Sequence, residues 1–352
     1  MISELCVIGH PSWCGGADTE LFHQIKCWHK MGIKTKILHT GPISNYYKKM
    51  EMEQYGCEYL AKPRQWQLAR GLHVISFCNS EFLSNLHYIH RYAKSTTFVN
   101  CMTYNFKKEM ECQDKGLIDF HLYQSDHGMQ NISKNMSHMK DYRPMRFTPY
   151  FDSDQFEYID KRPNDHFRFG RISRCDSTKF HSRQFQIYDA IKSPVEKSGV
   201  VLGWGPVVNA KMKIPKKDLN KRGTDTFYKN YIQIIDEGKI SQEDFYKFSD
   251  VLIMATETFE NLPRVGFEAM ASGTILMVDR RGGWKVEVED EKTGFLCNTP
   301  RDFVEKATYL ASNPDHKEEI RGLARQKLET EWGFENASKS WEKVFAEWEK
   351  LR

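Results

Sequence analysis

Two glutamates with seven residues between them mark the segment of the chain that is best suited to chemistry. Glu260 and Glu268 follow a short apolar run. Pro263 suits the first turn of a helix and Gly273 suits its end, which predicts that Glu260 lies in the loop before the helix. Glu268 then lies inside the helix, roughly 7 to 8 Å along its axis from Pro263 at about 1.5 Å of rise per residue. One extended ligand could therefore contact both carboxylates.

The turn that would begin this helix is suited to bind an anion or a sugar. Backbone N–H groups at a helix amino terminus are unpaired and carry a partial positive charge, so the turn from Asn261 to Pro263 could hold a diphosphate or sugar hydroxyls. A carboxylate in the same place could accept hydrogen bonds from hydroxyls. The alternative is structural: Glu260 is then a carboxylate at a helix start and Glu268 a solvated side chain.

Two series of short apolar runs alternate with helical patterns along the chain. This order favours parallel sheets covered on both faces, because parallel strands need crossover connections that are usually helical. A polar, proline-flanked segment separates the two series. The expected strands lie at 5–9, 35–39, 73–78 and 96–101 in the first series and at 168–172, 200–203, 231–235, 251–255 and 274–278 in the second. We therefore predict a first domain at 1–150, a linker at 151–163, a second domain at 164–335 and a final helix at 336–352.

Two of the expected helices have a clear apolar face. The first begins near Asp18 and should end at Gly32. The last covers residues 337–351 and must pack on another element, because its apolar stripe would otherwise face water. The apolar faces consist of Leu21, Ile25 and Trp28 in the first helix and of Trp341, Val344, Phe345 and Trp348 in the last.

The composition is typical of a folded protein with two domains. A chain of 352 residues exceeds the usual size of a single core, and a hydrophobic content of 40% can supply two. Nine scattered cysteines without a Cys-x-x-Cys pair argue against disulfides and structural zinc, which favours the cytoplasm. The sequence has no evident secretory signal and no run of about eighteen apolar residues, so we expect a soluble chain without a transmembrane segment. A net charge of +4 requires no polyanionic partner.

The segment around the two glutamates resembles a known family of enzymes. Glu260, Glu268 and the sequence Ala-Met-Ala-Ser-Gly at 269–273, followed by Gly-Phe-Leu at 294–296, are similar to the glycosyl transferases group 1 family. This is the large family of retaining GT-B glycosyltransferases with an E-x7-E motif that includes bacterial mannosyltransferases and sucrose synthases. The resemblance implies an α/β fold of two Rossmann-like, doubly wound domains facing a cleft, with the carboxyl-terminal helix crossing back to the first domain.

The resemblance also implies roles for individual residues. Glu260 would contact the transferred sugar, and Glu268 would hold the ribose of a nucleotide-diphosphate sugar. A glycine pair after the first strand would approach the donor phosphates and the acceptor, and the segment 238–240 would lie near the nucleotide base. The residues expected to bind the donor are Gly15, Gly16, Arg171, Ile240, Asn261, Leu262, Pro263 and Glu268.

Basic residues after an apolar run are similar to the family's phosphate clamp. The sequence Phe-Gly-Arg-Ile-Ser-Arg at 169–174, with Lys179 after it, resembles a strand-end Gly-Arg and a following lysine that bind the diphosphate. Fixed cations at this place would stabilise the negative charge of a departing nucleotide diphosphate. A short insertion precedes Lys179, so the family arginine corresponds to Arg171 or to Arg174. The expected catalytic residues are Glu260, Arg174 and Lys179, and the alternative for the cations is a solvated basic loop.

Two positions depart from the family pattern or offer a competing motif. Many relatives have a histidine after the strand at 96–101, where this chain has Asn100, whose amide can still bond to a sugar hydroxyl. The sequence Asp-Ser-Asp at 152–154 spells a metal-binding motif of another transferase class, but its place in the expected linker favours a turn. Other candidates, each more typical of a structural or exposed position, are His10, Asp126 and His127.

The resemblance implies transfer with retention of configuration and without a carboxylate nucleophile. The acceptor hydroxyl would attack from the side of the leaving group, and a phosphate oxygen would help to remove its proton. No metal or other cofactor is required in this scheme, because Arg174, Lys179 and backbone amides stabilise the diphosphate. UDP-glucose is the donor that the family favours, and the acceptor would be a glycan, a lipid-linked sugar or a small molecule.

Two alternative functions stay open at this point. Phage enzymes of the same fold glucosylate 5-hydroxymethyl pyrimidines in DNA, and the basic stretch 211–222 could run along phosphates, although a charge run is more often solvated. The missing histidine instead suits a nucleotide-sugar-binding protein that has lost turnover. Pocket shape and surface, rather than these motifs, decide the sugar, the base and the oligomeric state.

Overall fold

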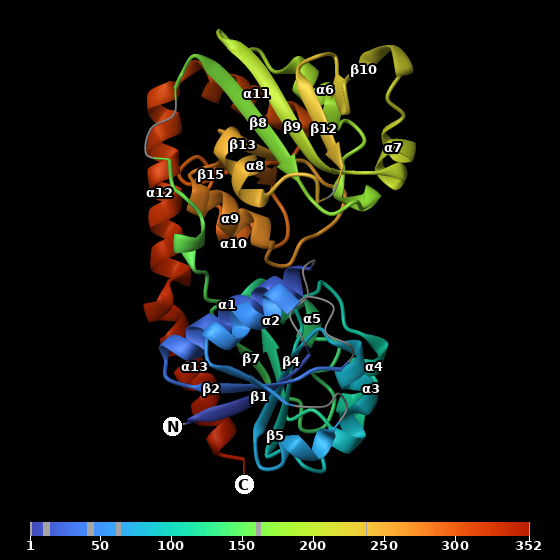
Figure 1. Ribbon diagram of the computed structural model, residues 1–352, viewed down its shortest axis with the longest axis vertical. Helices are drawn as coiled ribbons and strands as arrows, with labels where there is room; N and C mark the ends of the chain where they lie inside the picture. Colours follow the sequence, from blue (N-terminus) through green and yellow to red (C-terminus); the bar gives the residue numbers. More distant parts are fainter. Residues whose placement is uncertain are drawn as a thin grey trace. The chain divides into compact units, whose positions relative to one another are not determined.

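The computed structural model describes residues 2–9, 15–40, 46–60, 65–159, 163–236 and 238–351. The chain divides into two compact units: Met1–Asp152 with Thr330–Arg352, and Ser153–Glu329. The second boundary falls inside a long helix, α12 (Pro314–Trp332). Each unit has its own sheet and its own hydrophobic core (Figure 1).

A seven-stranded sheet forms the centre of the first unit, in the order β3-β2-β1-β4-β5-β6-β7, with every neighbouring pair parallel. The chain moves from β1 to one edge and then returns to build the other edge, which is doubly wound topology. The strands are β1 (Glu4–Ile8), β2 (Lys34–Leu38), β3 (Cys57–Tyr59), β4 (His73–Phe77), β5 (Ser95–Val99), β6 (Phe120–Tyr123) and β7 (Pro144–Arg146). The connections contain α1 (Gly16–Lys30), α2 (Tyr46–Gln54), the 3-10 turn η1 (Trp66–Ala69), α3 (Ser80–Ile89), α4 (Lys107–Asp114) and α5 (Asp126–Ser133).

The first unit buries the apolar face of α1 together with that of the last helix, α13 (Phe334–Glu349). Trp341 of α13 meets Trp28 of α1 edge to face, with 5.0 Å between the ring centroids. The indole N–H of Trp341 donates to Gln24 of α1 at 2.8 Å, so the one polar atom of this ring is satisfied inside the core. The packing of the carboxyl-terminal helix on the first unit, expected from the sequence, is confirmed.

The second unit contains an eight-stranded sheet in the order β10-β11-β12-β9-β8-β13-β14-β15. Neighbouring strands are parallel except at one edge, where β11 runs antiparallel to both β10 and β12. Helices α8 and α9 cover one face, and α6 and α11 cover the other (Figure 1). The strands are β8 (His166–Ile172), β9 (Glu196–Trp204), β10 (Leu219–Arg222), β11 (Asp225–Tyr228), β12 (Ile232–Asp236), β13 (Val251–Met254), β14 (Ile275–Asp279) and β15 (Gly294–Cys297). The helices and 3-10 turns are η2 (Ser153–Gln155), η3 (Ser177–Lys179), α6 (Gln184–Ala190), α7 (Pro206–Met212), η4 (Lys216–Asp218), α8 (Gln242–Phe248), α9 (Arg264–Ser272), α10 (Trp284–Glu287) and α11 (Pro300–Ser312).

The direction of winding in the second unit reverses between β8 and β13. After β8 the chain continues to β9 on one side, and after β13 it continues to β14 on the opposite side. Ligands of open parallel sheets bind at such a point, because the loops at the carboxyl ends of the two strands leave in opposite directions and open a crevice. The loops that follow β8 and β13 are therefore the places where a ligand site is expected.

Candidate functional site

The loops after β8 and β13 bring Lys179 and Glu260 together. The ammonium group of Lys179, at the end of η3, donates a hydrogen bond to a carboxylate oxygen of Glu260 in the loop before α9. The Lys179 side chain is 21% exposed and that of Glu260 is 15% exposed, so the pair is shielded from water but accessible. Two of the three residues expected to be catalytic thus meet at the winding reversal of the second unit.

Helix α9 begins beside this pair. Pro263 is its N-cap residue, and the helix ends at Gly273, whose φ of 70° is in the left-handed region that glycine adopts readily. Asn261 and Leu262 are buried in the turn before the helix. The predicted helix limits are confirmed to within one residue, and the first turn of α9 lies next to Lys179 and Glu260.

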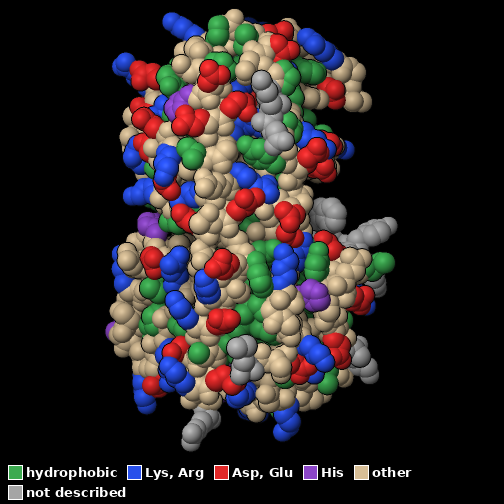
Figure 2. All heavy atoms as spheres, turned by 90° about the vertical axis from the view of Figure 1, so that its left-hand side faces the viewer, with side chains coloured by type: hydrophobic (Ala, Val, Ile, Leu, Met, Phe, Trp, Pro, Cys, Tyr) green, Lys and Arg blue, Asp and Glu red, His purple; other side chains and the backbone are tan. Residues whose placement is uncertain are grey.

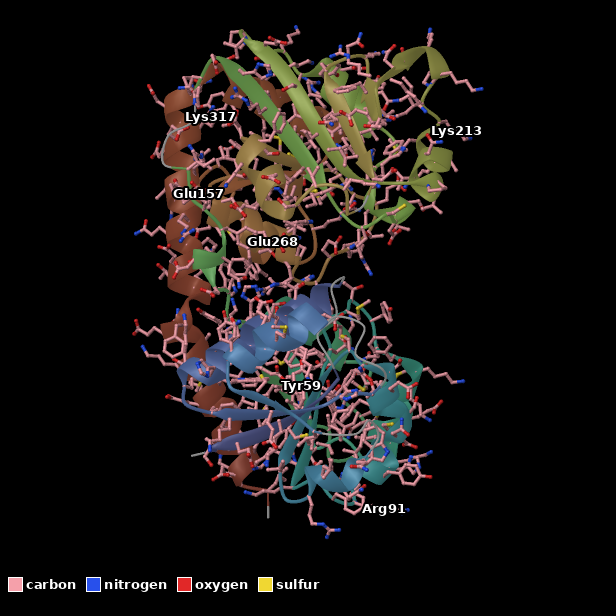
Figure 3. The ribbon with its side chains drawn as sticks, in the orientation of Figure 1. Tyr59, Arg91, Glu157, Lys213, Glu268 and Lys317 are labelled. Carbon is pink, nitrogen blue, oxygen red and sulfur yellow. The ribbon has the colours of Figure 1, made fainter. Side chains whose placement is uncertain are left out.

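Glu268 lies in the middle of α9 and is buried among the helices of the second unit (Figure 3). Its carboxylate accepts hydrogen bonds from the Tyr246 hydroxyl at 3.0 Å and from the Gln242 side chain at 3.3 Å. Burial raises the pKa of Glu268, and the hydrogen bond from Tyr246 partly opposes that shift. This burial excludes the alternative in which Glu268 is solvated. Ile240, expected near the nucleotide base, is half-buried two residues before Gln242.

The two candidate arginines have different environments. Arg171, at the end of β8, is fully buried, and its guanidinium lies over the ring of Phe180 at 3.9 Å. It donates to the backbone carbonyl of Lys179 and to the sulfur of Met254. Arg174 is exposed in the loop that follows β8. The buried guanidinium therefore supports the backbone at Lys179, and Arg174 is the arginine that a ligand can reach.

Sequence reasoning missed the glycine pair Gly282 and Gly283, which follows β14 and packs against the loop of Glu260. The amide of Gly283 donates to the carbonyl of Glu260 at 2.8 Å. A Cβ atom on Gly282 would overlap the Glu260 carbonyl, and one on Gly283 would overlap that of Asn261. The two loops can approach so closely only because both residues lack a side chain. A Gly-Gly sequence shortly after a strand was the signal that could have identified this contact.

A cavity of about 290 Å³ opens at the same edge of the sheet, at the carboxyl ends of β13, β14 and β15. Thr256, Glu257 and Arg281 line it, and neither Lys179 nor Glu260 does. Arg281 donates to the backbone carbonyl of Thr256 and so takes part in the support of the loop before Glu260. The cavity therefore lies beside the Lys179 and Glu260 pair, on the side of β14 and β15.

The candidates in the first unit are dispersed. Gly15 is the N-cap residue of α1, with a φ of 157°, and Gly16 is the first residue of that helix. Asn100 is buried, and its side-chain amide is hydrogen-bonded inside the unit. It donates to Glu109 at 2.9 Å and accepts from the Met102 amide at 2.8 Å. Asn100 therefore offers little to a sugar. Asp126 pairs with Arg146 and His127 bonds to Asn131, both at the surface, while His10 lies outside the described residues.

The competing metal motif forms part of a turn. Ser153 and Asp154 belong to the 3-10 turn η2, and Asp152 pairs with Lys26 of α1 at 3.0 Å. Among the described residues, no three His, Cys, Asp or Glu side chains are grouped so that they could hold a metal ion. In the same residues, no helix combines the length and the apolar character needed to cross a lipid bilayer.

Solved glycosyltransferases share the fold of the whole chain. HepE of Anabaena, solved in complex with UDP-glucose, superposes with a TM-score of 0.73 at 12% identity, covering 98% of this chain and 99% of HepE. A glycosyltransferase of Rickettsia africae ESF-5 superposes with a TM-score of 0.74 at 15% identity, covering 100% of both chains. Sucrose-phosphate synthase of Thermosynechococcus elongatus superposes with a TM-score of 0.72 at 11% identity, covering 98% of both chains. The predicted GT-B fold is confirmed.

The sequence match is narrower and lies in the second unit. Residues 228–327 match the family described as Glycosyl transferases group 1. Spore coat protein SA of Bacillus subtilis (strain 168) is 27% identical over 125 residues, which are 35% of this chain and 32% of that protein. The alignment thus spans about a third of the curated relative. The matched segment 228–327 contains Glu260, Glu268 and the pair Gly282 and Gly283, which confirms the resemblance to this family.

Proposed function

We propose that this protein is a retaining glycosyltransferase that moves a sugar from a UDP-sugar to an acceptor hydroxyl, with glucose as the sugar to test first. The observation that carries the proposal is the contact of Lys179 with Glu260 at the winding reversal, beside the amino terminus of α9. The group 1 match at 228–327 and the UDP-glucose complex of HepE favour a nucleotide sugar as the ligand.

The proposed donor would place its diphosphate between the cations and the first turn of α9. Lys179 and Arg174 supply positive charge, and the helix terminus supplies oriented amides, so the charge that develops on the leaving diphosphate is stabilised in place. Glu260 would accept hydrogen bonds from hydroxyls of the transferred sugar, and Glu268 from the ribose. We assign Arg171 to the support of Lys179 rather than to contact with the donor, because its side chain is fully buried.

The proposed transfer breaks the bond between the sugar anomeric carbon and the diphosphate oxygen and forms a bond to the acceptor oxygen on the same face. The acceptor proton passes to the leaving phosphate oxygen, so the scheme needs no carboxylate nucleophile. The contribution of the protein is then positioning and charge stabilisation. The acceptor that fits the family best is a glycan, a lipid-linked sugar or a small molecule.

The test is UDP release from UDP-glucose, measured with and without a panel of mono- and oligosaccharides. Glu260→Gln and Lys179→Met should each lower kcat by about 10²-fold to 10³-fold, the cost of removing one group that stabilises transition-state charge. Lys217→Met, at an exposed position, is the matched control and should retain wild-type turnover. Turnover that survives both site variants would overturn the proposal.

Two further readouts separate the alternatives. UDP should raise the melting temperature of the wild-type protein, since a ligand that binds only the folded chain stabilises it. A melting shift without any UDP release would identify a nucleotide-sugar-binding protein. Label transfer to 5-hydroxymethylated duplex DNA, weakened steeply by salt, would identify a DNA glycosyltransferase.

A further inference from the structure

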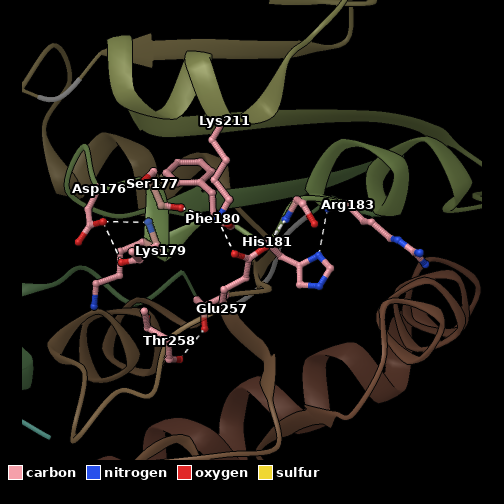
Figure 4. Close-up of polar contacts among 12 residues, drawn as sticks. Asp176, Ser177, Lys179, Phe180, His181, Arg183, Lys211, Glu257 and Thr258 are labelled. Atoms are coloured by element: carbon pink, nitrogen blue, oxygen red, sulfur yellow. Dashed lines mark hydrogen bonds and ion pairs between the residues drawn. The ribbon is translucent and has the colours of Figure 1, made fainter.

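The ammonium group of Lys211 joins the two loops that carry Lys179 and Glu260. Lys211 lies in the last turn of α7, and Figure 4 shows its side chain between the loop after β8 and the loop after β13. It donates to the carbonyl oxygens of Ser177 at 2.8 Å and Phe180 at 2.7 Å, and to the carboxylate of Glu257 at 2.7 Å. The three N–H donors of the ammonium group therefore match three acceptors.

The three residues that accept hydrogen bonds from Lys211 lie close to Lys179 and Glu260 in the sequence. Ser177 is the first residue of η3 and Phe180 is its C-cap residue, so they lie on either side of Lys179 in the sequence, and Glu257 precedes Glu260 by three residues. Further hydrogen bonds link the same loops, among them one from the His181 amide to the Ala255 carbonyl at 3.1 Å. The Glu257 amide donates to the Thr178 carbonyl at 3.2 Å, and the other oxygen of Glu257 accepts from the Ser182 amide at 3.0 Å.

Lys211 is less exposed than the other cations of the basic stretch 211–222. Its side chain is 22% exposed, whereas Lys213, Lys216 and Lys217 are exposed, and Figure 3 shows Lys213 at the periphery of the second unit. The neighbouring carboxylate of Glu257 makes the contact charge-assisted, which strengthens it relative to a neutral hydrogen bond. The hydrogen bond from Lys211 also lowers the pKa of Glu257, so the carboxylate stays ionised at neutral pH.

We propose that Lys211 is a positioning residue for the donor site: it clamps the loop of Lys179 to the loop of Glu260 and so fixes the distance between the two groups. This inference rests on the proposed function. A cation that stabilises the leaving diphosphate must be held in place before the reaction, and displacement by about 1 Å can cost about 10²-fold in rate. In this role Lys211 acts through the backbone on either side of Lys179 and through the Glu257 carboxylate, and not through contact with the donor or the acceptor.

The test compares Lys211→Met, which removes the donors, with Lys211→Arg, which keeps a charge and several donors. Lys211→Met should lower kcat/KM for UDP-glucose and weaken UDP binding by about 10-fold, while Lys211→Arg should stay within about 3-fold of the wild type. Lys217→Met, on the same basic stretch, is the matched control and should change neither quantity. Glu257→Gln removes only the charge of the acceptor, so its kcat/KM and its UDP affinity should lie between those of Lys211→Met and Lys211→Arg.

Amide hydrogen exchange of residues 177–182 in the full chain gives a readout that does not depend on turnover. These amides should exchange about 10-fold faster in Lys211→Met than in wild-type protein, since local opening no longer breaks the clamp. Should Lys211→Met fail to fold, Glu257→Gln and Lys211→Arg carry the comparison. Unchanged exchange, or wild-type kcat/KM in Lys211→Met, overturns the clamp and leaves the proposed function intact. Faster exchange in a protein that neither binds UDP nor turns over UDP-glucose supports the clamp and overturns the proposed function.

Discussion

The charged side chains around the first turn of α9 differ in how their charge is compensated. Lys179 and Glu260 neutralise each other at a partly exposed position. Glu268 is buried but accepts two hydrogen bonds. Glu287, at the end of α10, is fully buried, and neither of its oxygens has a hydrogen-bond partner among the described residues. Burial raises the pKa of Glu287 well above 4.5, although the guanidinium of Arg264 opposes the shift.

Glu287 should make the stability of the protein depend on pH. Between pH 4.5 and its raised pKa, the folded chain binds a proton that the unfolded chain has lost, so the unfolding free energy falls as pH rises. Glu287→Gln stays neutral and should remove up to about 1.4 kcal/mol of this loss per pH unit inside that window. Urea unfolding of both proteins from pH 5 to pH 8 measures the difference. Parallel curves would show that Glu287 is ionised in the folded protein.

At the scale of elements, the loop after β14 supports the loop that carries Glu260. Gly283→Ala should destabilise the protein by about 1–3 kcal/mol, because the new methyl group overlaps the Asn261 carbonyl and the backbone must move. UDP-glucose turnover should fall with it, since the displaced backbone carries Glu260. Gly322→Ala in α12, where a Cβ meets nothing within 4 Å, should instead stabilise by about 0.5–1 kcal/mol. Equal effects of the two substitutions would contradict the proposed support.

Helix α13 should contribute to the stability of the first unit through one central side chain. Trp341→Ala removes ring contacts to Trp28 and Phe147 and should cost about 3–5 kcal/mol of unfolding free energy. Trp341→Phe keeps most of these contacts but leaves Gln24 without the indole donor, so its loss should be smaller. Lys343→Ala on the exposed face of α13 is the control and should stay within about 0.5 kcal/mol. Urea unfolding followed by circular dichroism would refute this role if Trp341→Ala matched the control.

At the scale of the whole molecule, the face shown in Figure 2 carries positive charge that is dispersed rather than gathered in one patch. Lys and Arg side chains alternate with Asp and Glu on the face shown in Figure 2, in agreement with the net charge of +4. The basic stretch 211–222 forms the end of α7, the turn η4 and strand β10, and its first lysine is bonded inside the second unit. Lys211 is therefore engaged inside the unit, whereas Lys213, Lys216 and Lys217 are exposed, so the label-transfer experiment with duplex DNA separates the two acceptors.

The proposed reaction should proceed without a divalent cation. Lys179, Arg174 and the amides at the start of α9 would supply the positive charge that a metal gives to other transferases. UDP release by the full chain in EDTA should therefore stay within about 2-fold of the untreated rate, since no ligand of the diphosphate is removed. Loss of activity in EDTA, restored by Mn²⁺, would overturn the metal-free scheme.

The sequence by itself predicted the central strands of both sheets, the helices α1, α9 and α13, and most of the candidate residues. The β-α alternation, the limits of α9 and the apolar faces of α1 and α13 are local properties, because side-chain periodicity and capping depend on neighbours within a few residues. The short strands β3, β6, β7, β10, β11 and β15 were not predicted, since three or four residues give too little periodicity to detect. The two glutamates Glu260 and Glu268, with seven residues between them, and the distant Lys179 could be recognised from their residue types and positions in the sequence.

Only the tertiary structure decided which of these residues meet and which are buried. The contact of Lys179 with Glu260 spans 81 positions of the sequence, and it depends on β8 and β13 being neighbours in the sheet. The same packing buries Arg171, exposes Arg174 and turns Lys211 from a surface cation into a link between two loops. Residue types fix what a side chain can do, but distance and exposure come from strand order and packing, which no local pattern contains.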